Sequence, residues 1–150
     1  MTSSVSRPTD AAEVMDLVGK AFRQTRQPIE QLVRDHGITA AQYGILYQIA
    51  ANPGISRAEV ARQNFISPQA AQVALATLES KGLVARQSRS DSQRIVGAAL
   101  TEKGERVFRA CDARTAALAE DFVAPLRVVE RHMLIDLLRR CIEQMAEPSA

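Results

Sequence analysis

The sequence predicts a mainly α-helical fold of the α+β class, with a winged helix-turn-helix between long N- and C-terminal helices. Apolar residues recur at helical spacing through most of the 150 residues. Capping patterns start three short helices before residue 70. Two runs with strand character follow, separated by a short polar loop. We expect one domain, in which residues 38–100 form the winged unit and residues 9–37 and 101–147 form the long helices.

The first long helix is expected to begin at Thr9 or Asp10, where a capping side chain precedes an apolar run with helical spacing. Pro28 lies inside this run, and proline lacks the N–H group that a helix interior needs. We therefore expect a kink or a break into two pieces at that position. Gly37 is the stop signal of this helix.

The next two helices each begin with a capping box. Residues 39–42, Thr-Ala-Ala-Gln, have this pattern, and the helix after them is expected to reach about Ala51. Residues 56–59, Ser-Arg-Ala-Glu, have it again, ahead of a short helix that ends near Gln63 or Asn64. In such a box the first side chain accepts a hydrogen bond from the fourth residue's backbone, and the fourth side chain accepts one in return.

A longer helix and a hairpin complete the winged unit. Ser67 supplies a capping oxygen and Pro68 stands where its missing N–H costs nothing, so a helix starts here, and Gly82 closes it. Residues 83–88 and 94–100 are the two strand-like runs. A short helix, a tight turn, a longer helix and a hairpin with a basic loop follow one another in the order of a winged helix-turn-helix.

Two helices are expected after the hairpin. Thr101 caps the first, which runs to about Ala124, and Pro125 interrupts the chain before the second, at residues 128–145. The last helix carries an apolar stripe of Leu134, Leu137, Leu138, Cys141 and Met145. Because this stripe and that of the first helix exceed what the winged unit can cover, we expect the long helices to pair across a two-fold axis in a homodimer.

The helix at residues 68–81 is the expected recognition helix, because the major groove of B-DNA admits one α-helix, which a preceding helix braces. Its expected inward face consists of Ala71, Ala74, Leu75 and Leu78. Its expected outward face consists of Gln69, Gln72, Val73, Ala76 and Thr77. Glutamine pairs bidentately with adenine and valine contacts the thymine methyl group, so we expect an operator with A·T-rich half-site cores.

Side chains around this helix are expected to hold the DNA backbone. A helix N-terminus binds phosphate through its backbone N–H groups, and polar residues on the bracing helix are natural phosphate ligands. Arginines of the hairpin reach the backbone or the narrow minor groove. The expected DNA-contacting residues are Ser56, Arg57, Ser67, Pro68, Gln69, Gln72, Val73, Arg86, Arg89 and Arg94.

The distribution of charge supports DNA binding only mildly. The formal net charge is +2, and residues 55–104 carry seven Lys or Arg against four Asp or Glu. A solvated basic hairpin on a three-helix core would give the same excess, and winged folds also serve as protein-interaction modules. A helical dimer that binds a protein or carries a small molecule, without operator binding, is therefore an alternative.

Residues 55–86, "ISRAEVARQNFISPQAAQVALATLESKGLVAR", together with the wing and residues 100–104, "LTEKG", resemble the MarR family of bacterial transcriptional regulators. The resemblance includes residues 38–50 and covers essentially the whole chain. It implies an obligate homodimer whose first and last helices intertwine and whose two winged domains straddle a palindromic operator in double-stranded DNA. It also implies a cytoplasmic repressor that a small aromatic or lipophilic ligand releases from DNA.

Two features depart from the family pattern. Members often carry an arginine in the recognition helix at positions that match Val73 or Thr77, so guanine readout by arginine is not expected from this helix. The wing tip usually has Asp-x-Arg, whereas the spacing here is Asp91-Ser-Gln-Arg94. Arg94 matches the family's arginine that enters the minor groove.

The resemblance implies a ligand site as well, because MarR-like proteins bind small aromatic or phenolic anions between the dimerisation helices and the winged domain. Tyr43 and Tyr47 lie four residues apart on one helical face, and His36 precedes that helix. Phe22 and Arg26 on the first helix would add an apolar wall and a cation. The alternative is that both tyrosines pack in the core with their hydroxyls bonded at its edge.

Other chemistry is not expected. His36 and His132 lie on different helices without a nucleophile pattern, and the sequence has no metal-ligand cluster or phosphate-binding glycine loop, so we expect no enzyme, metal or cofactor. No signal peptide and no membrane-spanning run are expected. Cys111 and Cys141 fall on apolar stripes, which predicts buried, inert thiols. A thiol-based redox-sensing regulator is a minor alternative.

Overall fold

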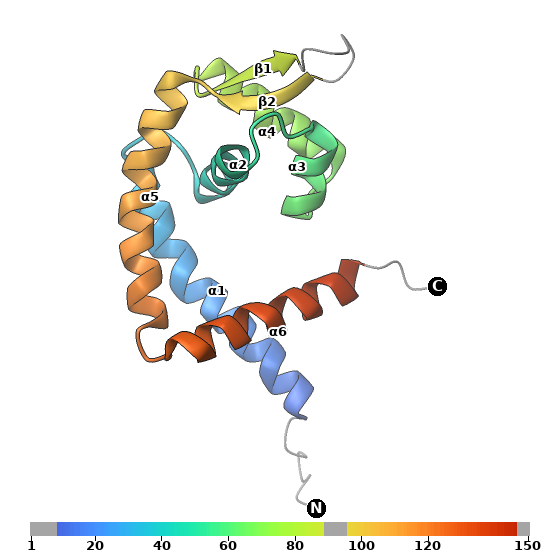
Figure 1. The fold of residues 1–150 in the computed structure, drawn as a ribbon, viewed down its shortest axis with the longest axis vertical. Coiled ribbons are helices and arrows are strands. Elements are labelled where there is room, and N and C mark those ends of the chain that lie inside the picture. The colour runs from blue at the N-terminus through green and yellow to red at the C-terminus, as the bar shows by residue number, and fades with distance from the viewer. Residues whose placement is uncertain (1–8, 89–95, 147–150) are drawn as a thin grey trace, which may run out of the picture. The chain divides into compact units, whose positions relative to one another are not determined.

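The computed structural model describes residues 9–88 and 96–146, and these confirm the mainly helical fold with a small two-stranded sheet (Figure 1). The chain divides after Thr115 into two compact units. Its elements are α1 (Asp10–Arg34), α2 (Ala40–Ala51), α3 (Arg57–Asn64), α4 (Pro68–Ser80), β1 (Val84–Ser88), β2 (Val96–Leu100), α5 (Glu102–Val123) and α6 (Val128–Ala146). Within the described ranges, no helix combines the length and apolarity that a membrane crossing requires.

Local capping explains why the predicted helix starts are correct. Thr39 and Gln42 form the full capping box, with their two reciprocal hydrogen bonds at 3.1 and 3.2 Å. The Ser56 side chain caps α3 by accepting a hydrogen bond from the N–H of Glu59 at 3.1 Å. The prediction of a full capping box is wrong here, because the Glu59 side chain does not bond back to the N–H of Ser56. The Glu59 carboxylate instead accepts hydrogen bonds from Arg62 and Gln63, and these hold its pKa down at about 2.

Pro28 does not divide the first helix. α1 continues through it to Arg34, so the predicted alternative of a break into two pieces is wrong. Proline removes one N–H donor and strains one turn, which a helix of 25 residues survives because the turns on both sides keep their bonds. The stop at Gly37 is confirmed, since the helix ends three residues earlier and this glycine has a φ of +71°.

The core of the winged unit is built around α2, which contacts α1, α3 and β2 (Figure 1). Leu46 and Ile49 of α2 are fully buried. β1 and β2 pair antiparallel, and an isolated bridge from Ile55 to Ala98 ties the start of α3 to the hairpin. Gly97 is required beside this bridge, because a Cβ atom there would lie 2.1 Å from the carbonyl oxygen of Gly54.

The last helix buries none of its residues within the single chain. Its exposed apolar residues are Val128, Val129, Met133, Leu134, Ile135, Leu137, Leu138, Ile142 and Met145. Cys141, on the same helix, is also exposed, so the prediction of a buried thiol at this position is wrong for the single chain. The helical period identified an apolar stripe correctly, but a period does not say what covers the stripe.

Candidate nucleic-acid interface

Helix α4, the expected recognition helix, is fixed by its cap and by the turn before it. The Ser67 hydroxyl accepts a hydrogen bond from the N–H of Ala70 at 3.1 Å, and Pro68 occupies the first helical turn. Phe65 has a φ of 53°, the left-handed conformation that lets the chain reverse between α3 and α4. This turn packs α3 against α4 and leaves the opposite face of α4 in solvent.

The inward face of α4 is the one that the sequence predicts, and the predicted outward face is exposed except at Thr77, which is half-buried. Ala71, Leu75 and Leu78 are buried, and Ala74 is partly buried against the core. The predicted contact residues Ser67, Gln69 and Val73 are exposed, with 66% of Val73 accessible to solvent. The helix therefore presents polar and methyl-bearing side chains outward from a rigid apolar base.

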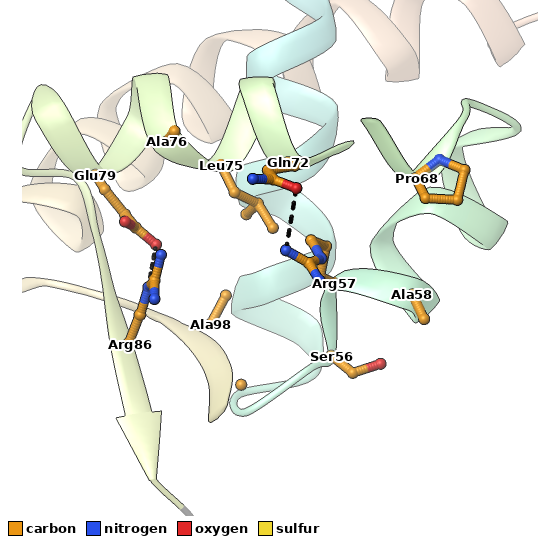
Figure 2. Close-up of a pocket in the computed structure, with 11 residues that line it drawn as sticks. Ser56, Arg57, Ala58, Pro68, Gln72, Leu75, Ala76, Glu79, Arg86 and Ala98 are labelled. Atoms are coloured by element: carbon orange, nitrogen blue, oxygen red, sulfur yellow. Dashed lines mark hydrogen bonds and ion pairs between the residues drawn. The ribbon is translucent and has the colours of Figure 1, made fainter. Parts of the chain in front are cut away.

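An open groove runs between α3, α4 and the base of the hairpin (Figure 2). It brings together five residues that the sequence assigns to DNA contact, namely Ser56, Arg57, Pro68, Gln72 and Arg86. Its other lining residues are Ala58, Leu75, Ala76, Glu79, Gly97 and Ala98. Arg89 and Arg94, the other two predicted wing contacts, and the Asp91 beside them lie outside the described residues.

Both arginines of the groove are engaged by side chains of α4. Arg57 Nη1 donates a hydrogen bond to Gln72 Oε1 at 3.3 Å, and Arg86 Nε forms an ion pair with Glu79 Oε1 at 3.3 Å (Figure 2). Glu79 is not among the contact residues that the sequence predicts. A signal was present, since position 79 lies seven residues after position 72 and therefore on the same helical face.

Three cations of the central region, outside the groove, are held by structural partners. Lys81 Nζ donates to the carbonyl oxygen of Gly37 at 2.6 Å, and Lys103 Nζ donates to the carbonyl oxygen of Lys81 at 2.8 Å. Arg62 pairs with Glu59 on α3. These contacts leave the charges in place, but none of the three side chains lines the groove.

The predicted ligand residues Tyr43 and Tyr47 flank Phe108 of α5. The Tyr43 ring stacks on the Phe108 ring at 6.0 Å between centroids, and its hydroxyl bonds to Asp112 at 2.9 Å and Thr115 at 2.7 Å. Burial raises the pKa of Tyr43 to about 12. Tyr47 is 55% exposed and meets Phe108 edge-on. Tyr43 thus fits the alternative of a tyrosine that packs against the core with its hydroxyl bonded at the edge. Tyr47 instead exposes its ring to solvent.

The other predicted ligand residues lie on or just after α1. The guanidinium carbon of Arg26 stands 5.5 Å from the centroid of the Phe22 ring, in a cation–π contact. Both residues line a shallow cleft on α1 together with Arg23, Gln27, Glu30, Gln31 and Arg34. His36 is partly buried in the turn after α1. The five predicted ligand residues therefore do not form one group. Phe22 and Arg26 contact each other, Tyr43 and Tyr47 each contact Phe108, and His36 stands apart from both pairs.

The buried cysteine does not favour the redox alternative. Cys111 is fully buried in the core, as predicted, and burial raises the pKa of its thiol. A raised pKa lowers the fraction of thiolate, which is the form that oxidants attack. Thr115, one turn further along α5, donates its hydroxyl hydrogen to the Cys111 carbonyl oxygen.

Comparison with known proteins agrees with this geometry. A sequence profile of the MarR family matches residues 36–95. The HTH-type transcriptional repressor Rv2887 of Mycobacterium tuberculosis is 39% identical over 88 residues, and the match covers 54% of this chain and 63% of that relative. A putative transcriptional regulatory protein for the hcr operon of Thauera aromatica is 31% identical over 130 residues, 87% of this chain and 76% of that protein.

Solved structures show the same fold. The M. tuberculosis MarR family protein Rv2887 in complex with salicylic acid superposes with a TM-score of 0.67 at 24% identity, over 93% of this chain and 99% of that one. S. aureus MepR in complex with DNA superposes with a TM-score of 0.74 at 17% identity, over 91% and 96%. On the match to the family profile and to the Thauera regulator, this chain belongs to the MarR family.

Proposed function

We propose that this protein is a dimeric transcriptional regulator, a repressor whose winged helix-turn-helix units bind a palindromic operator. The observation that carries the proposal is the groove beside α4, which is lined by Arg57, Gln72 and Arg86. This arrangement combines donors for phosphate with an amide for base edges, the two classes of contact that sequence-specific binding needs. The regulatory roles that the names of its relatives state, and the DNA complex of MepR, support it.

The proposed dimer would form through the long helices. α1 exposes Val14, Met15, Leu17, Val18 and Phe22, and α6 exposes the apolar residues described above. Soluble proteins seldom leave large apolar surfaces in water, and a large exposed apolar surface usually marks an interface with another molecule. A two-fold axis would place two recognition helices on successive half-sites of a palindrome, about 34 Å apart.

The proposed effector is a small aromatic or lipophilic anion. Two solved relatives of the same fold bind salicylic acid or salicylate. In this chain Phe22 and Arg26 supply an aromatic face beside a cation, and Tyr47 supplies an open ring. An effector that binds more tightly to a dimer with the wrong half-site spacing would shift the population toward it and release the operator.

A gel-shift experiment tests the proposed function directly. The full chain is titrated against duplex DNA that flanks its own gene, at fixed salt, with unrelated duplex as competitor and with or without salicylate. We expect a complex that survives the competitor and weakens when salicylate is added. Salicylate binding without any complex on the flanking DNA would instead favour the small-molecule carrier.

A related experiment concerns the ion pair inside the groove. Glu79→Gln should raise affinity for any duplex a few-fold, because Arg86 loses its carboxylate partner and becomes free to bind phosphate. The slope of log affinity against log salt should become steeper by up to about one. Glu105→Gln is the matched control, since it makes the same charge change at an exposed pair on α5. Equal gains in both variants would show that net charge alone matters.

A further inference from the structure

We propose that Arg57 is a positioning residue for base readout: it fixes the side-chain amide of Gln72 in the orientation that selects adenine. The proposal rests on the proposed function, because it concerns how the same groove recognises its operator. It gives Arg57 a role beyond that of a phosphate ligand. It also identifies which residue makes a flexible glutamine specific.

The two side chains come from different helices and meet over the groove. Arg57 is the first residue of α3 and Gln72 lies in the second turn of α4, fifteen residues later. Both line the groove and both are exposed at its surface (Figure 2). The cap at Ser56 fixes the start of α3, and the cap at Ser67 fixes the start of α4. The contact is therefore set by two helix starts before any DNA is present.

The chemistry of the pair allows only one orientation of the amide. A guanidinium group carries five N–H donors and no acceptor, so the atom of Gln72 that faces Arg57 must be the carbonyl oxygen. A flipped amide would place its N–H groups against those of Arg57. The hydrogen bond therefore holds Oε1 on the α3 side and turns Nε2 away from it.

An amide held in this way distinguishes adenine from guanine. Its oxygen has a second lone pair, so it still accepts one hydrogen bond while Nε2 donates another. Adenine offers the matching pair in the major groove, a donor at N6 and an acceptor at N7. Guanine offers two acceptors, N7 and O6, and the second would face the Gln72 oxygen. A glutamine that is free to flip could instead donate its N–H groups to the acceptors of either adenine or guanine, and it would distinguish the two bases less well.

Arg57 has N–H groups left for the DNA backbone. Only Nη1 bonds to Gln72, and the planar guanidinium can donate to a phosphate oxygen with its other nitrogens. Arg57 would then contact a DNA phosphate and the base-reading Gln72 at the same time. Removal of Arg57 should consequently lower affinity for all DNA and, separately, relax the choice of base at one position.

Selection from a random duplex library separates these two effects. The full chain and its Arg57→Ala, Arg57→Lys, Gln72→Ala and Arg62→Ala variants are each used to enrich sequences, and the position read by Gln72 is the one that loses its preference in Gln72→Ala. The wild type should favour adenine over guanine there on the order of ten-fold. Arg57→Ala should bring this ratio to about two or less, and the preferences at other positions should stay.

Two variants serve as controls. Arg57→Lys should keep the preference for adenine, because an ammonium group is also a donor without acceptors. Arg62→Ala removes the other arginine of α3, which pairs with Glu59, and should leave the preference unchanged. An Arg57→Ala protein that binds more weakly but keeps the full adenine preference would overturn the positioning role and leave Arg57 a phosphate ligand. A wild type that enriches no sequence would overturn the proposed function as well.

Discussion

Leu138→Glu should convert the protein from a dimer into monomers and reduce operator affinity by roughly a hundred-fold or more. Leu138 lies on the apolar stripe of α6, with 39% of its surface exposed in the single chain. A carboxylate buried in an apolar interface costs several kcal/mol unless it finds a partner. Without the dimer the two half-sites are bound independently, which forfeits the gain from linked binding.

Light scattering at micromolar concentration and a gel shift on the same sample measure both effects. Arg139→Gln is the matched control, because it changes the net charge by the same amount at the neighbouring position of α6, outside the apolar stripe. It should leave the dimer and the operator affinity intact. A Leu138→Glu protein that remains a dimer with full affinity would show that α6 does not form the interface.

Gly104→Ala should lower the free energy of unfolding by about 3 kcal/mol, which corresponds to roughly 10 °C in Tm for a chain of this size. Gly104 is buried in the first turn of α5, and a Cβ atom there would lie 1.9 Å from the carbonyl oxygen of Leu83. That oxygen accepts the N–H of Thr101 at 3.0 Å. The added methyl group must therefore push the start of α5 away from the hairpin and strain this bond.

Gly44→Ala provides the contrast in thermal unfolding. Gly44 lies inside α2, and the nearest atom to an added Cβ would be the side-chain oxygen of Asn64 at 4.0 Å. Alanine is the better helix former by about 1 kcal/mol, so this variant should be unchanged or slightly more stable. Destabilisation of equal size in both variants would refute the contact between Gly104 and Leu83 as the cause.

The helix and strand boundaries could be predicted because their signals are local. Thr39, Ser56 and Ser67 each bond to a backbone N–H three residues later, so the sequence holds both partners within one turn. The burial of Leu75 and Leu78 follows from helical period alone. The sequence places Gly104 in the family motif at residues 100–104 but gives no physical reason for a glycine there. A glycine is needed there because the backbone of Leu83 lies against it, and Leu83 is twenty-one residues away in the sequence, so only the fold shows this contact.

The residues of the candidate site could be predicted from the sequence, but the hydrogen bond and the ion pair that join them could not. Arg57, Gln72 and Arg86 were identified from residue type and position, whereas the partners of both arginines depend on how α3, α4 and β1 pack. The same limit applies to Tyr43. Its bond to Asp112 joins residues far apart in the chain, and no periodic pattern encodes it.

Base reading by α4 is tested most directly by a comparison of Gln72→Ala with the wild type on two duplexes at one salt concentration. On an operator enriched by the wild type, the variant should lose about 1–3 kcal/mol of binding free energy. On random duplex it should lose almost nothing, because glutamine adds no charge to nonspecific binding. Equal losses on both duplexes, or no loss on either, would show that Gln72 of α4 does not read bases.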